Sequence, residues 1–325
     1  MKICFIDKTP FQYNSKDLYS KNLRGAESVL INLSLALSKL GHQITIINNC
    51  PQTENINEIN WININSNFSS DKYDLVISNG DCQLFKYAKS KNNILFSHSI
   101  QSIEKFIRKK QLISFLKYKP KICFISEYHK IKRSKILYLF GSINLKWSVD
   151  EIFLKSEISN KIDNYQAIFT SNKDRNLDLL IDIWKNNIFP QNKKLKLLVN
   201  SEDDNEQNYH IYKRKIGHQK KLIDDLRNSR LYLIPGHKAE LFCLAAEEAR
   251  ELCIPIITLG IGCLKERVDH GVTGYVAKNK EEFAKYTLEL FSDDIKWNLF
   301  RNNLIKKRSL RTWDKVAEDL INQIR

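Results

Sequence analysis

Residues 234–274 read IPGHKAELFCLAAEEARELCIPIITLGIGCLKERVDHGVTG, and this stretch predicts a turn, a helix and a strand that follow an earlier strand. The apolar run at 231–234 is typical of a short buried strand, and Pro235-Gly236 is a turn signal at its end. Residues 244–252 are mostly good helix formers, and the apolar run at 254–258 predicts the next strand. This alternation indicates an α/β fold.

Two glutamates bracket the start of the predicted helix: Glu240 precedes it and Glu248 lies within it. A helix that begins just after a strand points unpaired N–H groups and a positive dipole into the crevice there, which makes a site for phosphate. At a rise of about 1.5 Å per residue the two carboxylates are expected on the order of 12 Å apart, with a diphosphate between them. Glutamates at this spacing are also common on solvated helices, so the pair alone does not decide.

The whole stretch resembles the donor-binding signature of the retaining glycosyltransferases of family 4. That signature has Glu, seven residues and Glu-Ala, then a Pro-headed strand, a glycine turn running to a Glu, and Asp-x-Gly-x-Thr-Gly. The matching positions are Glu240, Phe242, Glu248, Ala249, Pro255, Gly262, Glu266, Asp269, Gly271, Thr273 and Gly274. Leu241, Cys243 and Cys263 stand where glycine is usual. The resemblance implies the GT-B architecture, in which two Rossmann-like domains face each other across a cleft.

The resemblance also implies roles for individual residues. Glu240 is expected to position the donor sugar and to stabilise positive charge at its anomeric carbon, and Glu248 is expected to hold the ribose. The departing diphosphate is expected to contact backbone N–H groups of Phe242, Cys243, Leu244, Gly262, Cys263 and Leu264.

A second group of candidate residues follows the strand predicted at 165–170, in the loop that carries Lys173 and Arg175. Cations in a strand-to-helix loop can neutralise a diphosphate leaving group, although a surface charge pair is the alternative. The placement resembles the family's basic diphosphate-binding motif, which favours Arg175, with Lys173 second. Asp-x-Asp is absent from the sequence, so we expect no metal and no cofactor, the donor being a UDP or GDP sugar.

The N-terminal part predicts a similar unit. A strand at 2–6 is followed by an amphipathic helix that opens at Gly25 and by a strand at 43–47. This stretch resembles the family's Gly-Gly-x-Glu helix, with Arg24 in place of one glycine, which implies that Gly25 lets the backbone approach the donor diphosphate or the acceptor. His98 directly follows a strand predicted at 93–97, where open α/β sheets place ligands. A lone histidine is more often structural, but the resemblance implies a contact with the donor sugar or the acceptor.

Length and composition set limits on these interpretations. The chain has 325 residues, enough for two domains, and 42% of them are hydrophobic. No apolar run approaches the roughly 20 residues of a membrane span, and the chain starts directly with a strand, so we expect no signal peptide. The 7 cysteines are scattered without metal or redox spacing, which indicates buried thiols in a reducing cytoplasm.

A formal charge of +15 makes nucleic acid, anionic lipid headgroups and acidic glycans candidate partners, although a genome rich in A and T also inflates lysine. No nucleic-acid recognition module is present, so we expect no nucleic-acid partner. From Ile103 to Lys119, Phe, Ile and Leu mix with Lys and Arg, which predicts a basic amphipathic helix, and further basic residues follow a strand predicted at 121–125. Such a helix can lie on an anionic bilayer surface, so Ile103–Lys135 is a candidate for peripheral membrane contact. A solvated helix packed on the sheet is the alternative.

We expect an acceptor-side domain at 1–153, a nucleotide-sugar domain at 154–310, and a terminal helix at 311–325 that packs back toward the first domain, as the resemblance implies. The interpretation is a retaining, metal-independent glycosyltransferase of the hexosyltransferase type. It would move a sugar from a nucleotide-diphosphate donor to a glycan or lipid-linked acceptor of cell-surface polysaccharide or lipopolysaccharide, in the cytoplasm and peripherally on the inner face of the membrane. A nucleotide-sugar epimerase and a non-catalytic nucleotide-sugar-binding relative remain alternative hypotheses.

Overall fold

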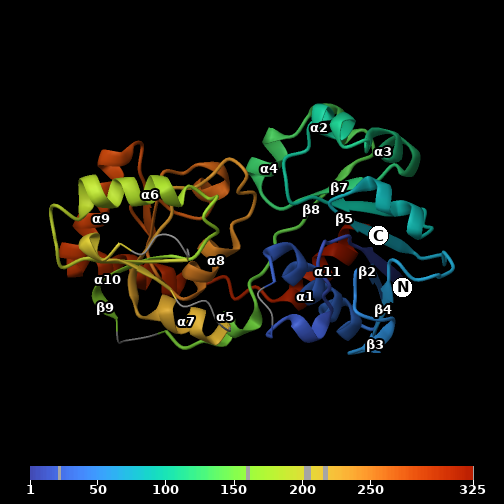
Figure 1. The fold of residues 1–325 in the computed structure, drawn as a ribbon, viewed down its shortest axis with the longest axis horizontal. Helices are drawn as coiled ribbons and strands as arrows, with labels where there is room; N and C mark the ends of the chain where they lie inside the picture. Colours follow the sequence, from blue (N-terminus) through green and yellow to red (C-terminus); the bar gives the residue numbers. More distant parts are fainter. Residues whose placement is uncertain (21–22, 159–161, 201–205, 215–218, 325) are drawn as a thin grey trace. The chain divides into compact units, whose positions relative to one another are not determined.

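The computed structural model describes residues 1–20, 23–158, 162–200, 206–214 and 219–324, and the chain divides into two α/β units (Figure 1). The first unit comprises Met1–Ser148 with Arg311–Arg325, and the second comprises Val149–Leu310. The second unit thus begins at Val149, before the expected boundary at 154. The reason is that α5 (Glu151–Lys155) is bonded within the second unit, where Arg308 donates to the Leu154 carbonyl over 2.9 Å.

The first unit is built on an eight-stranded sheet, counted over the described residues, in the order β3-β4-β2-β1-β5-β6-β7-β8. Its strands are β1 (Lys2–Ile6), β2 (Gln43–Asn48), β3 (Glu54–Ile56), β4 (Ile59–Asn63), β5 (Leu75–Asn79), β6 (Asn93–Phe96), β7 (Lys121–Phe124) and β8 (Ser142–Asn144). Every neighbouring pair is parallel except β3 with β4. Such a sheet is buried on both faces, which explains the continuous apolar runs of β1 and β5.

The helices of the first unit follow the strands in the usual crossover pattern. They are η1 (Ser15–Asp17), α1 (Gly25–Lys39), η2 (Cys82–Tyr87), α2 (Ile103–Arg108), α3 (Leu112–Tyr118), α4 (Glu127–Lys132), η3 (Lys135–Tyr138) and α11 (Trp313–Ile324). The single basic helix expected from Ile103 to Lys119 is wrong, because the structure has two short helices there, α2 and α3. Lys110 has a φ of +55°, which ends α2 before α3 begins.

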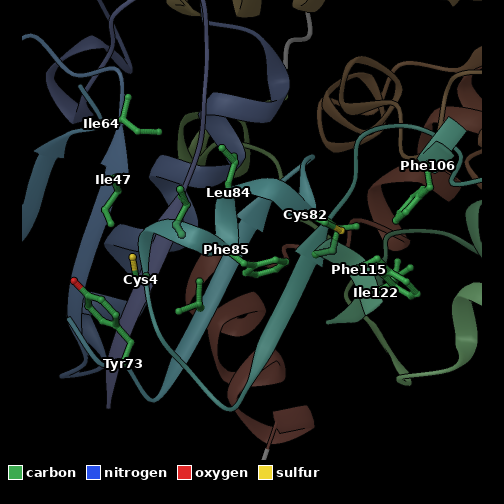
Figure 2. Close-up of a cluster of buried hydrophobic side chains, with 14 of the residues drawn as sticks. Cys4, Ile47, Ile64, Tyr73, Cys82, Leu84, Phe85, Phe106, Phe115 and Ile122 are labelled. Carbon is green, nitrogen blue, oxygen red and sulfur yellow. The ribbon is translucent and has the colours of Figure 1, made fainter. Parts of the chain in front are cut away.

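One face of the first sheet carries the core cluster drawn in Figure 2. Strand residues such as Cys4 and Ile122 pack there against Phe85 of η2, Phe106 of α2 and Phe115 of α3. The rings of Phe106 and Phe115 meet edge to face, with centroids 5.4 Å apart. These two aromatic side chains hold both short helices on the sheet, and each buried ring contributes about 2–3 kcal/mol.

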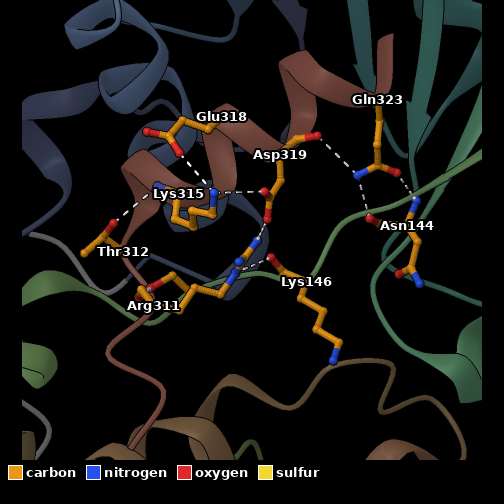
Figure 3. A network of polar contacts seen from close by, with 9 residues as sticks. Asn144, Lys146, Arg311, Thr312, Lys315, Glu318, Asp319 and Gln323 are labelled. Carbon is orange, nitrogen blue, oxygen red and sulfur yellow. Dashed lines mark hydrogen bonds and ion pairs between the residues drawn. The ribbon is translucent and has the colours of Figure 1, made fainter. Parts of the chain in front are cut away.

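The last helix, α11, packs against α1 within the first unit. Figure 3 shows the polar contacts that fix it: Gln323 exchanges hydrogen bonds with the backbone of Asn144, and Arg311 bonds both Asp319 and the Lys146 carbonyl. The buried apolar face of α11 consists of Trp313, Val316, Ala317, Leu320 and Ile321. The residues from Arg311 onward therefore complete the first unit.

The second unit contains a six-stranded, all-parallel sheet among the residues described, in the order β11-β10-β9-β12-β13-β14. Its strands are β9 (Asp163–Phe169), β10 (Lys196–Val199), β11 (Ile211–Lys213), β12 (Ser229–Leu233), β13 (Ile256–Thr258) and β14 (Gly274–Val276). Its helices besides α5 are α6 (Leu177–Ile183), η4 (Trp184–Ile188), η5 (Gln207–Tyr209), α7 (Gln219–Arg227), α8 (Leu244–Glu251), η6 (Gly262–Glu266), α9 (Lys280–Ser292) and α10 (Asp294–Lys306). The expected fold class, an α/β chain of two Rossmann-like units, is confirmed.

The strand order of each sheet reverses at one point. In the second unit the chain moves from β9 outward to β10 and β11, then returns to β12 on the other side of β9. In the first unit β1 lies between β2 and β5 in the same way. Open α/β sheets bind ligands outside the carboxyl ends of the strands at such points.

Two other features bear on the sequence predictions. All seven cysteines are buried and unpaired, as expected. Within the described part of the chain, no helix is long and apolar enough to cross a bilayer.

Candidate functional site

An ion pair joins the two loops at the reversal point of the second sheet. Arg175 follows β9, Glu240 follows β12, and the Arg175 Nε lies 2.8 Å from the Glu240 Oε1. The Glu240 side chain is mostly buried, whereas about a third of the Arg175 side chain is exposed. Burial raises the pKa of Glu240, although the charge of Arg175 acts in the opposite direction. The pair therefore presents a cation to solvent and holds a carboxyl group beneath it.

Two side chains that the sequence analysis did not select hold this pair in place. The Nδ1 of His237 accepts from the Ala239 N–H over 3.1 Å and lies 3.4 Å from Nη1 of Arg175. Asn176, with a φ of +65°, donates from its amide to the Gly236 carbonyl over 2.5 Å. Asparagine tolerates this left-handed conformation better than most residues. Both residues follow strand ends closely, the same signal that selected His98.

Helix α8 begins next to Glu240 with its first N–H groups free of a side-chain cap. Cys243 is the N-cap, has a φ of +60° and makes no capping hydrogen bond. The amides of the first turn have no carbonyl partner within the helix, so they and the helix dipole favour an anion here. Leu244 is the first residue of α8, and Phe242 is buried just before it. Cys243 thus adopts a backbone conformation that usually requires glycine.

The turn at Gly262 fixes the loop that carries Glu240. Gly262 has a φ of +76°, and a Cβ atom there would lie 2.4 Å from the His237 carbonyl oxygen and 2.8 Å from that of Glu240. The Cys263 N–H donates to the same Glu240 carbonyl over 3.0 Å. Cys263 and Leu264 are buried in η6. Only glycine permits this close approach of the two backbones.

Arg267 holds the segment between Glu240 and α8, and it was not predicted from the sequence. Its Nε donates to the Phe242 carbonyl over 2.8 Å, its Nη1 lies 3.4 Å from Glu247, and its guanidinium lies 4.2 Å from the Phe242 ring centroid. Phe242 is thus held by a hydrogen bond and a cation–π contact at the start of α8.

Glu248 lies on the next turn of α8, close to a second carboxylate. Burial, and secondarily the negative charge of Asp150, raise the pKa of Glu248 to about 7, while Arg214 acts in the opposite direction. Asp150 itself caps α5 through a 3.0 Å hydrogen bond from the Ile152 N–H. A carboxyl group with such a pKa can gain or lose its proton near neutrality.

The structure brings most of the predicted donor-site residues together in the second unit. These are Arg175, Glu240, Phe242, Cys243, Leu244, Gly262, Cys263 and Leu264. Lys173 lies in the same loop as Arg175, and its carbonyl accepts from the Leu177 N–H over 3.2 Å. Glu248 lies on α8, while His98 and Gly25 belong to the first unit.

His98 lies at the carboxyl edge of the first sheet, next to polar residues from neighbouring strands. Its Nε2 is 2.5 Å from the Asn79 Oδ1, and its ring centroid is 5.4 Å from that of Trp147. Burial, with the charge of Arg24, lowers the pKa of His98 to about 4, so the imidazole is neutral at physiological pH. Asp7, at the end of β1, accepts a 2.6 Å hydrogen bond from the Tyr13 hydroxyl. Gly25 is the exposed first residue of α1.

Two Rossmann-like units are the architecture of the GT-B glycosyltransferases. The second unit also carries the pair of Arg175 and Glu240 beside the N-terminus of α8. Residues 170–308 match the family model of glycosyl transferases group 1. The second unit therefore belongs to glycosyl transferases group 1, and the chain is a glycosyltransferase. The family expected from the sequence is confirmed at this level.

Solved structures share the fold over the whole chain at low sequence identity. WaaG, a glycosyltransferase involved in lipopolysaccharide biosynthesis, matches with a TM-score of 0.68 and 11% identity over 99% of each chain. HepE from Anabaena, solved in complex with UDP and glucose, matches with a TM-score of 0.69 and 15% identity over 100% of this chain and 99% of its own. Sucrose-phosphate synthase from Thermosynechococcus elongatus gives 0.69 and 12% over 100% and 98%. No curated protein matches the sequence.

Proposed function

We propose that this glycosyltransferase transfers a hexose from a UDP-sugar, with retention of configuration, to a glycan or lipid-linked acceptor of cell-surface polysaccharide or lipopolysaccharide. The observation that carries the proposal is the 2.8 Å pair of Arg175 and Glu240 beside the N-terminus of α8. The choice of UDP is supported by the fold shared with HepE, which was solved with UDP-glucose. The choice of acceptor is supported by the fold shared with WaaG.

In this proposal the diphosphate of the donor lies between Arg175 and the first turn of α8. The guanidinium offers N–H donors in a fork that fits phosphate oxygens, and the helix amides add further donors. A diphosphate would place negative charge beside the Glu240 carboxyl group. Burial already raises the pKa of Glu240, so this group takes up a proton more readily than an exposed glutamate. Glu240 can then accept or donate hydrogen bonds to sugar hydroxyls.

The transfer step requires no nucleophile from the protein. The bond between the anomeric carbon and the diphosphate oxygen breaks, and its electron pair leaves with the phosphate. The acceptor oxygen bonds to the anomeric carbon on the same face, and its proton passes to the departing phosphate oxygen. Arg175 and the α8 amides stabilise the charge that develops on that oxygen, and no metal is required in this scheme. Glu248 would hold the ribose and His98 would contact the sugar or the acceptor.

Ligand-dependent thermal shifts test the donor site directly. A ligand that binds only the folded protein raises its apparent stability, so UDP and UDP-sugars are expected to raise the melting temperature, and GDP to do so less. Arg175→Gln should abolish the UDP shift. Lys280→Gln, which breaks an exposed pair with Asp182 in the same unit, serves as the control and should keep it. A UDP shift that persists in Arg175→Gln would contradict the site.

Product analysis tests the reaction. Glu240→Gln is expected to lower turnover at least about 100-fold with little change in UDP affinity, because its hydrogen bonds matter most as charge develops. The anomeric configuration of the product, read by proton NMR, should equal that of the donor. An epimerised sugar formed without acceptor would favour a nucleotide-sugar epimerase. UDP binding without any slow hydrolysis of the donor would favour a non-catalytic relative.

A basic and apolar surface on the first unit supports peripheral contact with an anionic membrane. This basic-apolar surface comprises the exposed residues Ile107, Arg108, Lys109, Lys110, Ile113, Leu116, Lys117, Lys130, Ile131, Lys132, Lys135, Ile136 and Leu139 on or beside α2, α3, α4 and η3. From Ile103 to Lys135 the chain has 11 Lys and Arg against 2 Glu. Exposed isoleucine and leucine gain free energy on entering the headgroup region, and the basic residues are attracted to anionic lipid.

Vesicle binding tests this contact with a matched pair of exposed isoleucines. Ile113 is 80% exposed on the basic-apolar surface, and Ile295 is 86% exposed on α10 of the second unit. Ile113→Ser is expected to weaken binding to phosphatidylglycerol vesicles several-fold, since each buried apolar side chain contributes about 1–2 kcal/mol. Ile295→Ser should bind as the wild type does. Equal effects of both substitutions, or equal binding to phosphatidylcholine vesicles, would contradict the proposal.

A further inference from the structure

The first unit contains a buried arginine whose side chain lacks a hydrogen-bond acceptor. Arg133, at the end of α4, is 4% exposed. None of its Nε, Nη1 and Nη2 atoms has a hydrogen-bond partner among the described residues. A buried charge without a partner is strongly destabilising, and few buried polar groups stay unsatisfied in folded proteins. The position therefore calls for a partner outside the chain.

Aromatic rings cover the guanidinium without satisfying it. Its Cζ lies 3.9 Å from the ring centroid of Phe124 and 3.4 Å from that of Tyr138. Ring faces attract the positive charge but accept no in-plane N–H bonds, and the only polar atom of these two side chains, the Tyr138 hydroxyl, already donates to the Lys130 carbonyl over 3.2 Å. Tyr138 is 37% exposed, so Arg133 lies one side chain beneath the surface. Such a fixed fork is suited to two parallel hydrogen bonds with a carboxylate or phosphate.

Neighbouring polar atoms also lack partners. Gln101 and His129 are buried and share a 2.9 Å hydrogen bond between Oε1 and Nε2, yet the Gln101 Nε2 and the His129 Nδ1 bond to nothing in the described chain. Burial, followed by the positive charges of Arg133 and His98, lowers the pKa of His129 to about 3. These residues follow β6 and β7, at the carboxyl edge of a parallel sheet, where ligands bind.

Arg230 in the second unit shows how this protein satisfies a buried guanidinium with its own atoms. Its Nε donates to the Leu290 carbonyl over 2.8 Å, its Nη1 to Asn164 over 3.2 Å, and its Nη2 to Asp294 over 2.6 Å. It also lies over an aromatic ring, that of Trp297. Arg133 has the aromatic contacts of Arg230 without any of its acceptors.

We propose that the Arg133 guanidinium, with the Gln101 amide beside it, binds an anionic group of the acceptor, a phosphate or a carboxylate. This inference rests on the proposed function only in naming the acceptor as the source of the anion. The inference narrows the class of acceptor to molecules that carry a negative charge as well as hydroxyl groups. The anion enters past Tyr138, and the exposed Ile136 and Leu139 flank the same segment.

Inorganic phosphate is the probe, titrated in thermal-shift measurements at constant ionic strength with saturating UDP present to occupy the donor site. The wild type is expected to gain melting temperature with phosphate but not with chloride. Arg133→Gln should lose the phosphate shift and keep the UDP shift. Lys91→Gln, an exposed residue of the same unit outside the basic-apolar surface and with the same change of charge, should keep both. A phosphate shift that survives in Arg133→Gln, or is lost equally in Lys91→Gln, overturns the site.

Stability without phosphate separates a ligand site from a structural arginine. Arg133→Met should be no less stable than the wild type in phosphate-free buffer, because it removes an unsatisfied buried charge. Arg230→Met removes satisfied hydrogen bonds and should lower the melting temperature by several degrees. If Arg133→Met loses as much as Arg230→Met, Arg133 is structural and the proposal is overturned.

Vesicles identify the source of the anion. A loss of binding to phosphatidic acid vesicles in Arg133→Gln, beyond that in Lys132→Gln, assigns the anion to a lipid headgroup. Loss of the free phosphate shift alone assigns it to a water-soluble acceptor, and loss of neither overturns the site. A wild type that responds to phosphate but not to UDP would refute the proposed donor chemistry and leave this site standing.

Discussion

Replacement of Glu248 by glutamine is expected to remove a pH dependence of stability from the second unit. In the folded protein the pKa of Glu248 rises from 4.5 to about 7. A raised pKa means that the folded state holds the proton more tightly than the unfolded state. The stabilisation is therefore complete below about pH 4.5 and is lost as the pH rises to about 7.

The size of the effect follows from the shift. One pKa unit corresponds to about 1.4 kcal/mol, so a fully buried carboxyl group with this shift would lose about 3 kcal/mol. The Glu248 side chain keeps partial contact with solvent, and screening reduces the loss to roughly 1–2 kcal/mol. Glu248→Gln has no carboxyl group to ionise, so its stability should be flat across the same range.

Hydrogen exchange of the α8 amides measures the stability of this part of the second unit. Comparing wild type and variant at the same pH removes the intrinsic effect of pH on the exchange rate. Asp150→Asn is the matched variant: it removes the neighbouring negative charge and keeps the Oδ1 that caps α5. It should move the pKa of Glu248 back toward 4.5 and narrow the pH range. A difference between wild type and Glu248→Gln that stays constant from about pH 5 to 8 would refute this reasoning.

Further predictions concern binding, packing and acid stability. UDP affinity, measured by calorimetry, should rise up to tenfold per pH unit toward pH ~7 in the wild type and not in Glu248→Gln, because the ribose contact proposed for Glu248 requires the ionised carboxylate. Gly262→Ala should lower the free energy of unfolding by at least about 2 kcal/mol, because its Cβ would clash with backbone oxygens. Gly271→Ala has a similar positive φ but open space around it, so it should cost only about 1 kcal/mol. Equal losses in the two variants would contradict the clash at Gly262. His129, with a pKa lowered from 6.5 to about 3, should destabilise the wild type by up to about 1.4 kcal/mol per pH unit below 6.5, and acid titration of His129→Gln should show a smaller loss. Removal of residues 311–325 should cost the first unit about 5–10 kcal/mol by exposing the apolar face of α11, and unchanged circular dichroism after truncation would count against it.

Hydrophobic periodicity was enough to predict the strands and helices that form the core of both units. The run at 2–6, the amphipathic helix from Gly25 and the strand-helix-strand at 231–258 all match the structure. The segment 54–63, with β3 and β4, was missed because its asparagines hide the alternation of a strand. The break between α2 and α3 was missed because nothing local marks Lys110 for a positive φ.

The candidate site was predicted in part because residues 234–274 resemble a family signature and because its residues follow strand ends, which are both local signals. Arg175 and Glu240 were both selected, but their ion pair depends on β9 and β12 being neighbours, which is a property of the sheet. Arg267 donates to the backbone carbonyl of Phe242, which lies well apart in sequence, and no sequence pattern predicts such a contact. The unsatisfied guanidinium of Arg133 is likewise visible only when every potential acceptor around it is known.

The second unit is inserted between two parts of the first, because the chain leaves the first unit at Ser148 and re-enters it at Arg311. The second unit can therefore fold from one unbroken segment of chain. The first unit cannot be completed until its last helix docks, and until then the α1 surface that faces α11 stays uncovered. A chain truncated after Leu310 would thus expose this apolar surface and be a natural client for chaperones.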